Sequence, residues 1–197
     1  MYVIFEGGDG AGKDTQADLL WKKKPAAMRI NEPDSSLPTG KLLREFLKSG
    51  DHPKAHAALF LADRMAMMYA KVMPALDQGT DVICVRSFLS TIAYQQEHWP
   101  KNWLFDIHRM LPCKANFIFL LDVDPAEGLK RVGKRGVDVE VYEKLEIQQR
   151  IRQRYLDIAK DPRMESFLTA GGKVIVLDTN GKTPEEVHEQ VMKHLGG

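Results

Sequence analysis

The chain has 197 residues, of which 44% are hydrophobic and 28% are charged, and its formal net charge is +1. This balance is typical of a globular domain and excludes disordered and fibrous proteins, so we expect residues 1–197 to form a single domain. A near-zero net charge provides no broad positive field for nucleic acid or an anionic membrane, and we expect neither as a partner.

Short apolar runs alternate along the chain with longer segments of helical period. The runs are rich in β-branched residues and, apart from Arg29, continuously apolar, which is typical of buried parallel strands. They cover residues 2–5, 27–30, 82–85, 117–121 and 174–177. This alternation predicts an α/β fold in which helices flank a five-stranded parallel sheet. Because ligands of such folds bind beyond the carboxyl ends of the strands, we expect functional residues directly after strands.

Two of the predicted helices have clear start signals. Asp124 and Thr183 are each followed by proline and then, three residues after the cap, by a glutamate. A capping side chain satisfies free backbone amides, and proline suits the first helical position. We therefore expect helices to begin at Pro125 and Pro184.

The cysteines and the amino-terminal residues indicate in which cell compartment the protein resides. Cys84 and Cys113 lie in apolar surroundings without the spacing of a metal site, as reduced core thiols do. The first residues contain no basic region followed by a long apolar stretch, and no apolar run reaches the roughly 18 residues that cross a bilayer. We expect a cytoplasmic protein that is neither exported nor inserted into a membrane.

A glycine-rich loop, Gly-Gly-Asp-Gly-Ala-Gly-Lys, follows the first predicted strand, and a helix is expected to begin near Asp14 or Thr15. This context fits the Walker A pattern, in which backbone amides and a helix N-terminus face phosphate oxygens and the lysine reaches the β and γ phosphates. The alternative is a glycine-rich turn without a ligand. The sequence thus predicts a P-loop NTPase fold that binds ATP. The expected nucleotide-binding residues are Gly7, Gly8, Asp9, Gly10, Ala11, Gly12, Lys13, Asp14 and Thr15.

The loop departs from the Walker A pattern after its lysine. That position is normally Ser or Thr, whose hydroxyl binds Mg²⁺, and here it is Asp14. A carboxylate can bind Mg²⁺ directly or through water, but it also adds negative charge beside a triphosphate. We hypothesise that Asp14 helps to hold the Mg²⁺ that accompanies ATP.

Several segments resemble thymidylate kinases, a family of nucleoside monophosphate kinases, in the same order and spacing. They are residues 5–16 (FEGGDGAGKDTQ), 59–64 (LFLADR), 90–95 (STIAYQ) after Arg86, and 121–125 (LDVDP). The resemblance covers nearly the whole chain. It implies that the protein transfers the γ-phosphate of ATP to dTMP, giving dTDP, and that it uses Mg²⁺ and forms a homodimer. It also implies a small lid over ATP at about residues 130–143.

The resemblance assigns roles at the acceptor site. Phe60 and Arg64 are four residues apart, so they share one face of a helix. The resemblance implies that Phe60 stacks on thymine and that Arg64 donates to its O4, where cytosine has an amino donor instead. From the residues alone, core packing of Phe60 and a surface ion pair of Arg64 are the alternatives. The expected substrate contacts are Asp9, Phe60, Arg64, Arg86, Ser90, Thr91, Tyr94 and Gln95.

Basic residues follow the fourth predicted strand, where a lid would close over ATP. Some relatives have a catalytic arginine at the position of Gly10, so the resemblance implies that a lid residue supplies this charge here. A solvated basic helix face is the alternative. The expected catalytic residues are Lys13, Arg86, Arg131 and Arg135.

Four positions depart from the family pattern where chemistry takes place. Asp14 replaces Ser or Thr, Asn31 and Val141 each replace Arg, and Val85 replaces Asp. These departures leave open a kinase for another deoxynucleoside monophosphate or for a deoxynucleoside, and a degenerate homologue that binds nucleotides without turnover. Residues 178–181 match the D-x-x-G of GTPases, but no N-K-x-D follows them, which argues against a GTPase switch.

Overall fold

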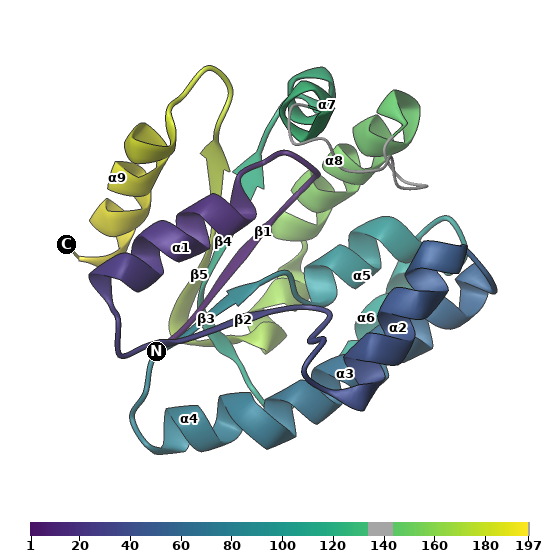
Figure 1. Cartoon of the computed structure of the whole chain (residues 1–197), viewed down its shortest axis with the longest axis horizontal. Helices are drawn as coiled ribbons and strands as arrows, with labels where there is room; N and C mark the ends of the chain where they lie inside the picture. The colour runs from purple at the N-terminus through teal and green to yellow at the C-terminus, as the bar shows by residue number, and fades with distance from the viewer. Residues whose placement is uncertain (134–143, 197) are drawn as a thin grey trace.

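A five-stranded parallel sheet forms the centre of the computed structural model, which describes residues 1–133 and 144–196 (Figure 1). The strand order is β2-β3-β1-β4-β5. The strands are β1 (Tyr2–Gly7), β2 (Met28–Asn31), β3 (Val82–Val85), β4 (Ala115–Asp122) and β5 (Leu168–Asp178). The predicted α/β fold is confirmed. Strand β5 begins earlier than predicted because its first half, which has no apolar run, still pairs with the start of β4 across a register shift.

Helices cover both faces of the sheet. They are α1 (Lys13–Lys23), α2 (Pro38–Ser49), η1 (Pro53–Ala55), α3 (His56–Met67), the π-helical turn η2 (Met68–Val72), α4 (Met73–Asp77), α5 (Phe88–Gln95), α6 (Lys101–His108), α7 (Pro125–Gly133), α8 (Leu145–Ala159), η3 (Pro162–Phe167) and α9 (Pro184–Leu195). Helices α1 and α9 lie on one face, and α3, α5, α6 and α8 lie on the other (Figure 1). The predicted caps are confirmed: Thr183 and Glu186 form a capping box, and Asp124 accepts the amide of Ala126.

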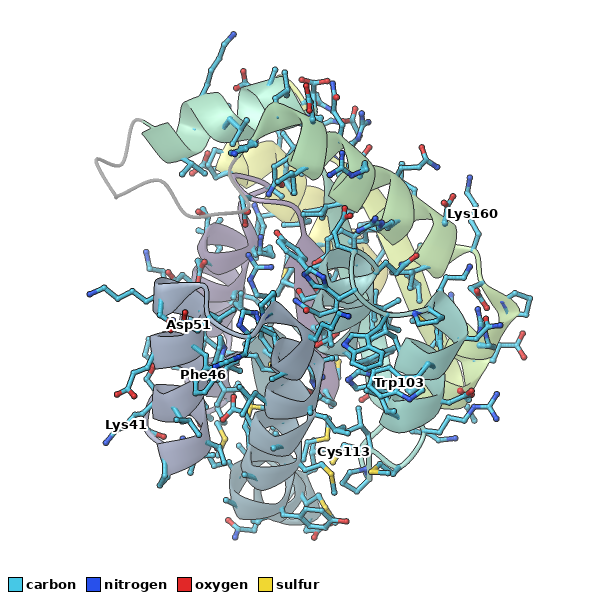
Figure 2. The ribbon with its side chains drawn as sticks, turned by 90° about the vertical axis from the view of Figure 1, so that its right-hand side faces the viewer. Lys41, Phe46, Asp51, Trp103, Cys113 and Lys160 are labelled. Carbon is cyan, nitrogen blue, oxygen red and sulfur yellow. The ribbon has the colours of Figure 1, made fainter. Side chains whose placement is uncertain are left out.

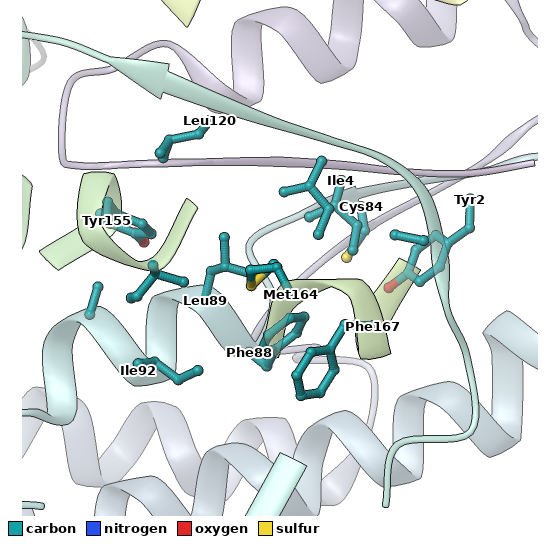
Figure 3. Packing of buried hydrophobic residues seen from close by; sticks show 14 of the residues in the cluster. Tyr2, Ile4, Cys84, Phe88, Leu89, Ile92, Leu120, Tyr155, Met164 and Phe167 are labelled. Carbon is teal, nitrogen blue, oxygen red and sulfur yellow. The ribbon is translucent and has the colours of Figure 1, made fainter. Parts of the chain in front are cut away.

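Alternate residues of β1 pack into two separate cores because successive side chains of a strand point to opposite faces. Ile4 belongs to the core beneath α5 and α8, where the rings of Phe88 and Phe167 stack at 4.1 Å (Figure 3). Phe5 belongs to the core beneath α1 and α9, where it stacks on Phe119 at 5.5 Å. Burial of each such side chain contributes about 1.5–3 kcal/mol.

Helices α2 and α3 lie side by side, and α3 packs in turn on α5 and α6 (Figures 1 and 2). Helices α2, α3 and α5 and the carboxyl ends of β2 and β3 surround a cavity. The predicted lid needs a correction at its start, because residues 130–133 belong to helix α7. The remaining lid positions, including Arg135 and Val141, lie outside the described residues. Among the described helices, none is long and apolar enough to cross a membrane.

Candidate active site

The loop between β1 and α1 folds around the ammonium group of Lys13. Its Nζ donates to the carbonyl oxygens of Gly7 at 2.9 Å and Gly8 at 2.7 Å. An ammonium group has three N–H donors, so a third is available for a phosphate oxygen. Helix α1 begins at Lys13 itself, with Gly12 as its N-cap at φ 92°, so its free backbone amides face the same loop.

Gly10 has no room for a side chain. Its φ is 74°, and a Cβ atom there would lie 2.1 Å from the carbonyl oxygen of Gly128 in α7. The backbone of α7 therefore packs directly on the phosphate loop. An arginine at position 10, as in some relatives, would require α7 to move.

We predict that catalysis declines above about pH 8 because Lys13 loses its proton there. Burial and, next, the charge of Arg86 lower the pKa of Lys13 to about 8. The neutral amine cannot stabilise phosphate charge, so kcat/KM, which reports on the free enzyme, should show an alkaline limb near this pH. In Lys13→Arg the limb should disappear, because arginine keeps its charge. A wild-type profile that is flat to about pH 10, near the ordinary lysine pKa, would contradict the assignment.

A donor cavity of about 460 Å³ lies on one side of the phosphate loop. Residues 10–12, Thr15 and Gln16 form its floor, and the loop between β5 and α9 forms a wall. Arg131 lies in this cavity, where its Nη2 donates to the carbonyl of Thr179 at 3.0 Å and its Nε pairs with Glu127 at 3.2 Å. Arg131, which the sequence predicts to be a lid residue, thus belongs to α7 and lines the donor cavity.

An acceptor cavity of about 250 Å³ lies on the other side of the loop, between the ends of β2 and β3 and helices α2, α3 and α5. Arg86 lies at the end of the cavity beside the loop residues Asp9 and Asp14, and Phe60 comes from α3. Arg64 and Thr91 are buried and do not line it. The structure thus brings together six of the predicted substrate residues: Asp9, Phe60, Arg86, Ser90, Tyr94 and Gln95.

Asp9 and Arg86 form the polar centre of the acceptor cavity. Arg86 Nη2 donates to Asp9 Oδ1 at 2.8 Å, and Tyr94 donates to the same oxygen at 3.1 Å. Gln148, on α8, donates to Asp9 Oδ2 at 2.7 Å. Burial opposes ionisation of Asp9, but the charges of Arg86 and Lys13 outweigh it and keep the pKa of Asp9 below its usual value. The carboxylate is therefore ionised and holds the guanidinium in place.

Arg86 has a backbone conformation that is rare for a side chain of its size. Its φ is 72°, a left-handed geometry that costs about 1–3 kcal/mol outside glycine. The buried carboxylate of Glu6 holds the following residues: Ser87 Oγ donates to it at 2.7 Å and Ser90 Oγ at 2.8 Å, with Tyr155 at 3.0 Å. These bonds fix the turn that directs Arg86 toward the phosphate loop.

Arg64 is buried beside the acceptor cavity and does not line it together with Phe60. Its side chain is 1% exposed and forms an ion pair with Glu32, with Nη2 and Oε2 separated by 2.5 Å. Nη1 hydrogen-bonds His108 at 2.8 Å, and Nη2 donates to Thr91 at 3.2 Å. The charge of Arg64 is thus neutralised by a buried partner that directly follows β2.

Gln95 is a buried amide next to this group. It is fully buried, lines the acceptor cavity, and neither its Oε1 nor its Nε2 has a hydrogen-bond partner among the described residues. Buried polar atoms of this kind are rare in native proteins. The pair of atoms offers one acceptor and two donors to a polar ligand.

Asp14 lies on the acceptor side of the loop. Its Oδ1 accepts from Asn31 Nδ2 at 2.9 Å and from Arg29 Nη2 at 3.3 Å, and Arg29 in turn pairs with Asp18 at 2.6 Å. Within residues 1–133 and 144–196, no group of three or more His, Cys, Asp or Glu is arranged to hold a metal ion. The hypothesis of a metal ligand at Asp14 therefore gains no support from the geometry.

Sequence reasoning missed Glu6, Glu32, His108 and Gln148. The two glutamates lie in or next to segments that resemble the family, so their position was visible but their burial was not. His108 and Gln148 lie outside every matched motif, and their partners are 44 and 139 residues away in the chain. No signal in a single sequence connects residues so far apart.

The fold and the two cavities define a class of protein. A phosphate loop lies between them, with Lys13 bound inside the loop and Arg86 in the acceptor cavity. A nucleoside triphosphate in the first cavity would direct its terminal phosphate toward a ligand in the second. This arrangement is that of a P-loop phosphotransferase with a small-molecule acceptor.

Comparison with known proteins identifies the family. The thymidylate kinase family model matches residues 5–191. A probable thymidylate kinase from Methanocaldococcus jannaschii is 35% identical over 198 residues, which cover 99% of this chain and 95% of that protein. The structure of thymidylate kinase from Candida albicans is similar with a TM-score of 0.80 and 28% identity, over 99% of this chain and 90% of that one. The chain belongs to the thymidylate kinase family, and it is an ATP-dependent kinase of this type.

Proposed function

We propose that this protein transfers the γ-phosphate of ATP to dTMP and releases ADP and dTDP. The observation that carries the proposal is the acceptor cavity, whose lining includes the ring of Phe60, the unpaired amide of Gln95 and the guanidinium of Arg86, which pairs with Asp9 of the phosphate loop. These groups suit the base and the phosphate of a nucleotide. Family membership supports the same acceptor.

The reaction joins two polyanions, so cations and positioning supply most of the catalysis. An oxygen of the dTMP phosphate attacks the γ-phosphorus, and the bond from that phosphorus to the β–γ bridging oxygen breaks as ADP leaves. Arg86 binds the acceptor phosphate, and Lys13 stabilises the negative charge on the transferred group. Arg131 holds the wall of the donor cavity, and we propose Arg135 as a further cation.

Base and sugar recognition are assigned to the opposite end of the cavity. Phe60 stacks on the pyrimidine ring, while Gln95 pairs with polar atoms at its edge and Arg64 donates to O4. Ser90 completes the surroundings of the base, and Thr91 contributes through its hydrogen bond with Arg64. Tyr94, held by Asp9, lies where a 2′-hydroxyl would be crowded. The two unpaired atoms of Gln95 support this assignment because bound thymine would provide the missing partners.

We propose that Mg²⁺ reaches the site with ATP, where it neutralises phosphate charge. The Asp14 carboxylate already accepts two hydrogen bonds on the acceptor side, whereas Thr15 lines the donor cavity. We therefore expect phosphates and water to supply most of the ligands.

The substitution Asp14→Ala tests this arrangement. We expect the Mg²⁺ concentration for half-maximal turnover to stay unchanged, while KM for dTMP changes because Asn31 and Arg29 lose their partner. The measurement is a Mg²⁺ titration at saturating ATP, with Asp18→Ala as a matched control that leaves Asp14 in place. A marked rise in the Mg²⁺ requirement would instead make Asp14 a metal ligand.

A homodimer in the cytoplasm completes the proposal. The dimer is inferred from family resemblance, and the cytoplasm from two free cysteines, of which Cys84 is buried. We propose nucleotides as its small-molecule partners, and neither nucleic acid nor a membrane.

The acceptor is tested by measuring ADP release from ATP and Mg²⁺ with dTMP, dUMP, dCMP, dGMP, dAMP or thymidine. We expect dTMP to have the highest kcat/KM. A panel is needed because broad substrate specificity is described for the Candida albicans relative. Turnover of thymidine without turnover of any monophosphate would exclude the proposed function.

A further inference from the structure

His108 lies at the end of α6 and is completely buried against the guanidinium of Arg64. Its Nδ1 is 2.6 Å from the carbonyl oxygen of Leu104. A carbonyl oxygen can only accept, so Nδ1 carries the proton, and Nε2 of the neutral ring has a free lone pair. Nε2 therefore accepts a hydrogen bond from Arg64 Nη1 at 2.8 Å.

The donors of Arg64 can be counted. A guanidinium has five N–H groups. The single Nε–H is shared between the two oxygens of Glu32, and the two on Nη2 are directed at Glu32 and Thr91. One N–H of Nη1 is bound by His108. Among the described residues, one N–H of Nη1 is left without a partner. Arg64 does not itself line the acceptor cavity, but its partner Glu32 does, so the guanidinium lies directly behind the cavity lining.

We propose that His108 is a positioning residue for base selection, which acts by locking Arg64 so that its one remaining N–H is directed at the acceptor base. The inference rests on the proposed function, because it deepens the role given there to Arg64. Glu32 fixes one edge of the guanidinium and His108 fixes the opposite nitrogen. Together they prevent the plane from rotating.

The fixed orientation of Arg64 matters because Gln95 alone cannot discriminate thymine from cytosine. An amide can rotate by half a turn and so present its donor and acceptor in either order to the edge of a base. Arg64 can only donate, so it hydrogen-bonds the carbonyl oxygen of thymine but not the amino group of cytosine, provided that its N–H is held at that atom. Selection therefore depends on keeping one donor of Arg64 in a fixed place.

The charge state of His108 is consistent with this role. Burial and, next, the positive charge of Arg64 lower the pKa of His108 to about 3. The ring therefore remains neutral across the physiological range, and Nε2 remains an acceptor. A protonated ring would direct an N–H at the guanidinium and break the lock.

The test compares His108→Phe with His108→Gln, using the ratio of kcat/KM for dTMP to that for dCMP. Phenylalanine keeps the ring volume but has no acceptor, so the ratio should fall about tenfold, mainly through a higher KM for dTMP, while kcat changes little. Glutamine can place its Oε1 near the position of Nε2, and it should retain most of the selectivity. If the Phe variant does not fold, His108→Met removes the same acceptor.

His56→Phe is the matched control. His56 is 2% exposed and its Nε2 bonds the carbonyl of Asp51 at 2.9 Å, but it makes no recorded contact with Arg64. Its replacement should cost stability without changing the ratio. An unchanged ratio and KM in a folded His108→Phe or His108→Met variant would overturn the inference. In that case, a changed dTMP-to-dCMP ratio in Arg64→Met would leave the proposed function standing and exclude only the role of His108. A wild-type enzyme without activity on dTMP would exclude the proposed function itself.

Discussion

Replacing Arg86 with methionine is expected to lower kcat/KM for dTMP about 10³-fold, because the acceptor phosphate loses its main cation in a partly buried site. Arg86 is also the partner of Asp9, which holds Tyr94. The residue assigned to the sugar therefore loses part of its support at the same time. ATP binding should persist, since Lys13 and the phosphate loop are unchanged. Steady-state kinetics and ATP titration measure the two effects separately.

Arg163→Met is the matched control for Arg86→Met. Arg163 likewise pairs with an aspartate, Asp161, at 2.7 Å and lies over an aromatic ring, that of Phe105, at 4.0 Å. It lies outside both cavities. The control should lose some stability and keep its kcat/KM. A wild-type-like kcat/KM in Arg86→Met would show that another group binds the acceptor phosphate.

Replacing Arg64 with methionine is expected to reduce the free energy of unfolding by about 3–5 kcal/mol, because Glu32 is left buried without its cation. The variant should also lose its preference for dTMP over dCMP. When Glu32→Gln is added to Arg64→Met, the double variant should regain part of the free energy of unfolding but none of the preference for dTMP over dCMP. Urea unfolding and the kcat/KM ratio separate the two consequences.

The stability loss in Arg64→Met should depend on pH. Burial raises the pKa of Glu32 above the ordinary glutamate value. A carboxyl with a raised pKa in the folded state is favourable when protonated, and this contribution is lost as pH rises through the folded pKa. The deficit should therefore be largest at neutral and alkaline pH and shrink as pH falls toward about 4.3. A deficit that does not vary with pH would point to lost packing rather than to the unpaired carboxylate.

Strands β1 and β3, which lead into the phosphate loop and Arg86, could be predicted from sequence because they are buried along their length and mostly apolar. The edge strands β2 and β5 are only partly buried. The phosphate loop was equally visible, since Gly10 and Lys13 have roles that only a few residue types can fill. The start of β5 could not be predicted from sequence, because its pairing with Ala115 depends on the neighbouring strand rather than on its own residues.

The environment of Arg64 could not be predicted for a different reason. Helical spacing placed Arg64 on the same face as Phe60, but it could not show that Glu32 and His108 compete for the guanidinium. Glu32 directly follows β2 and His108 ends α6, and only the tertiary fold brings these two residues to Arg64 of α3. Spacing within one helix predicts neighbours, whereas the direction of a long side chain depends on contacts made elsewhere.

Two departures from the family pattern prove to be neighbours. Asn31 and Val85 are directly opposite each other on β2 and β3. The arginine and aspartate of the family are therefore both missing from one place at the edge of the acceptor cavity. Asn31 bonds Asp14 instead. Relative to the pattern that the chain resembles, the three positions keep one carboxylate and lose one positive charge.

The central claim is tested most directly by following the labelled γ-phosphate of ATP in the presence of Mg²⁺ and equal amounts of dTMP and thymidine. Chromatography then separates dTDP from dTMP and identifies the product that carries the label. The account predicts label in dTDP, formed by transfer to the monophosphate. Label in dTMP, formed by transfer to thymidine, or no labelled nucleotide other than ATP would contradict it.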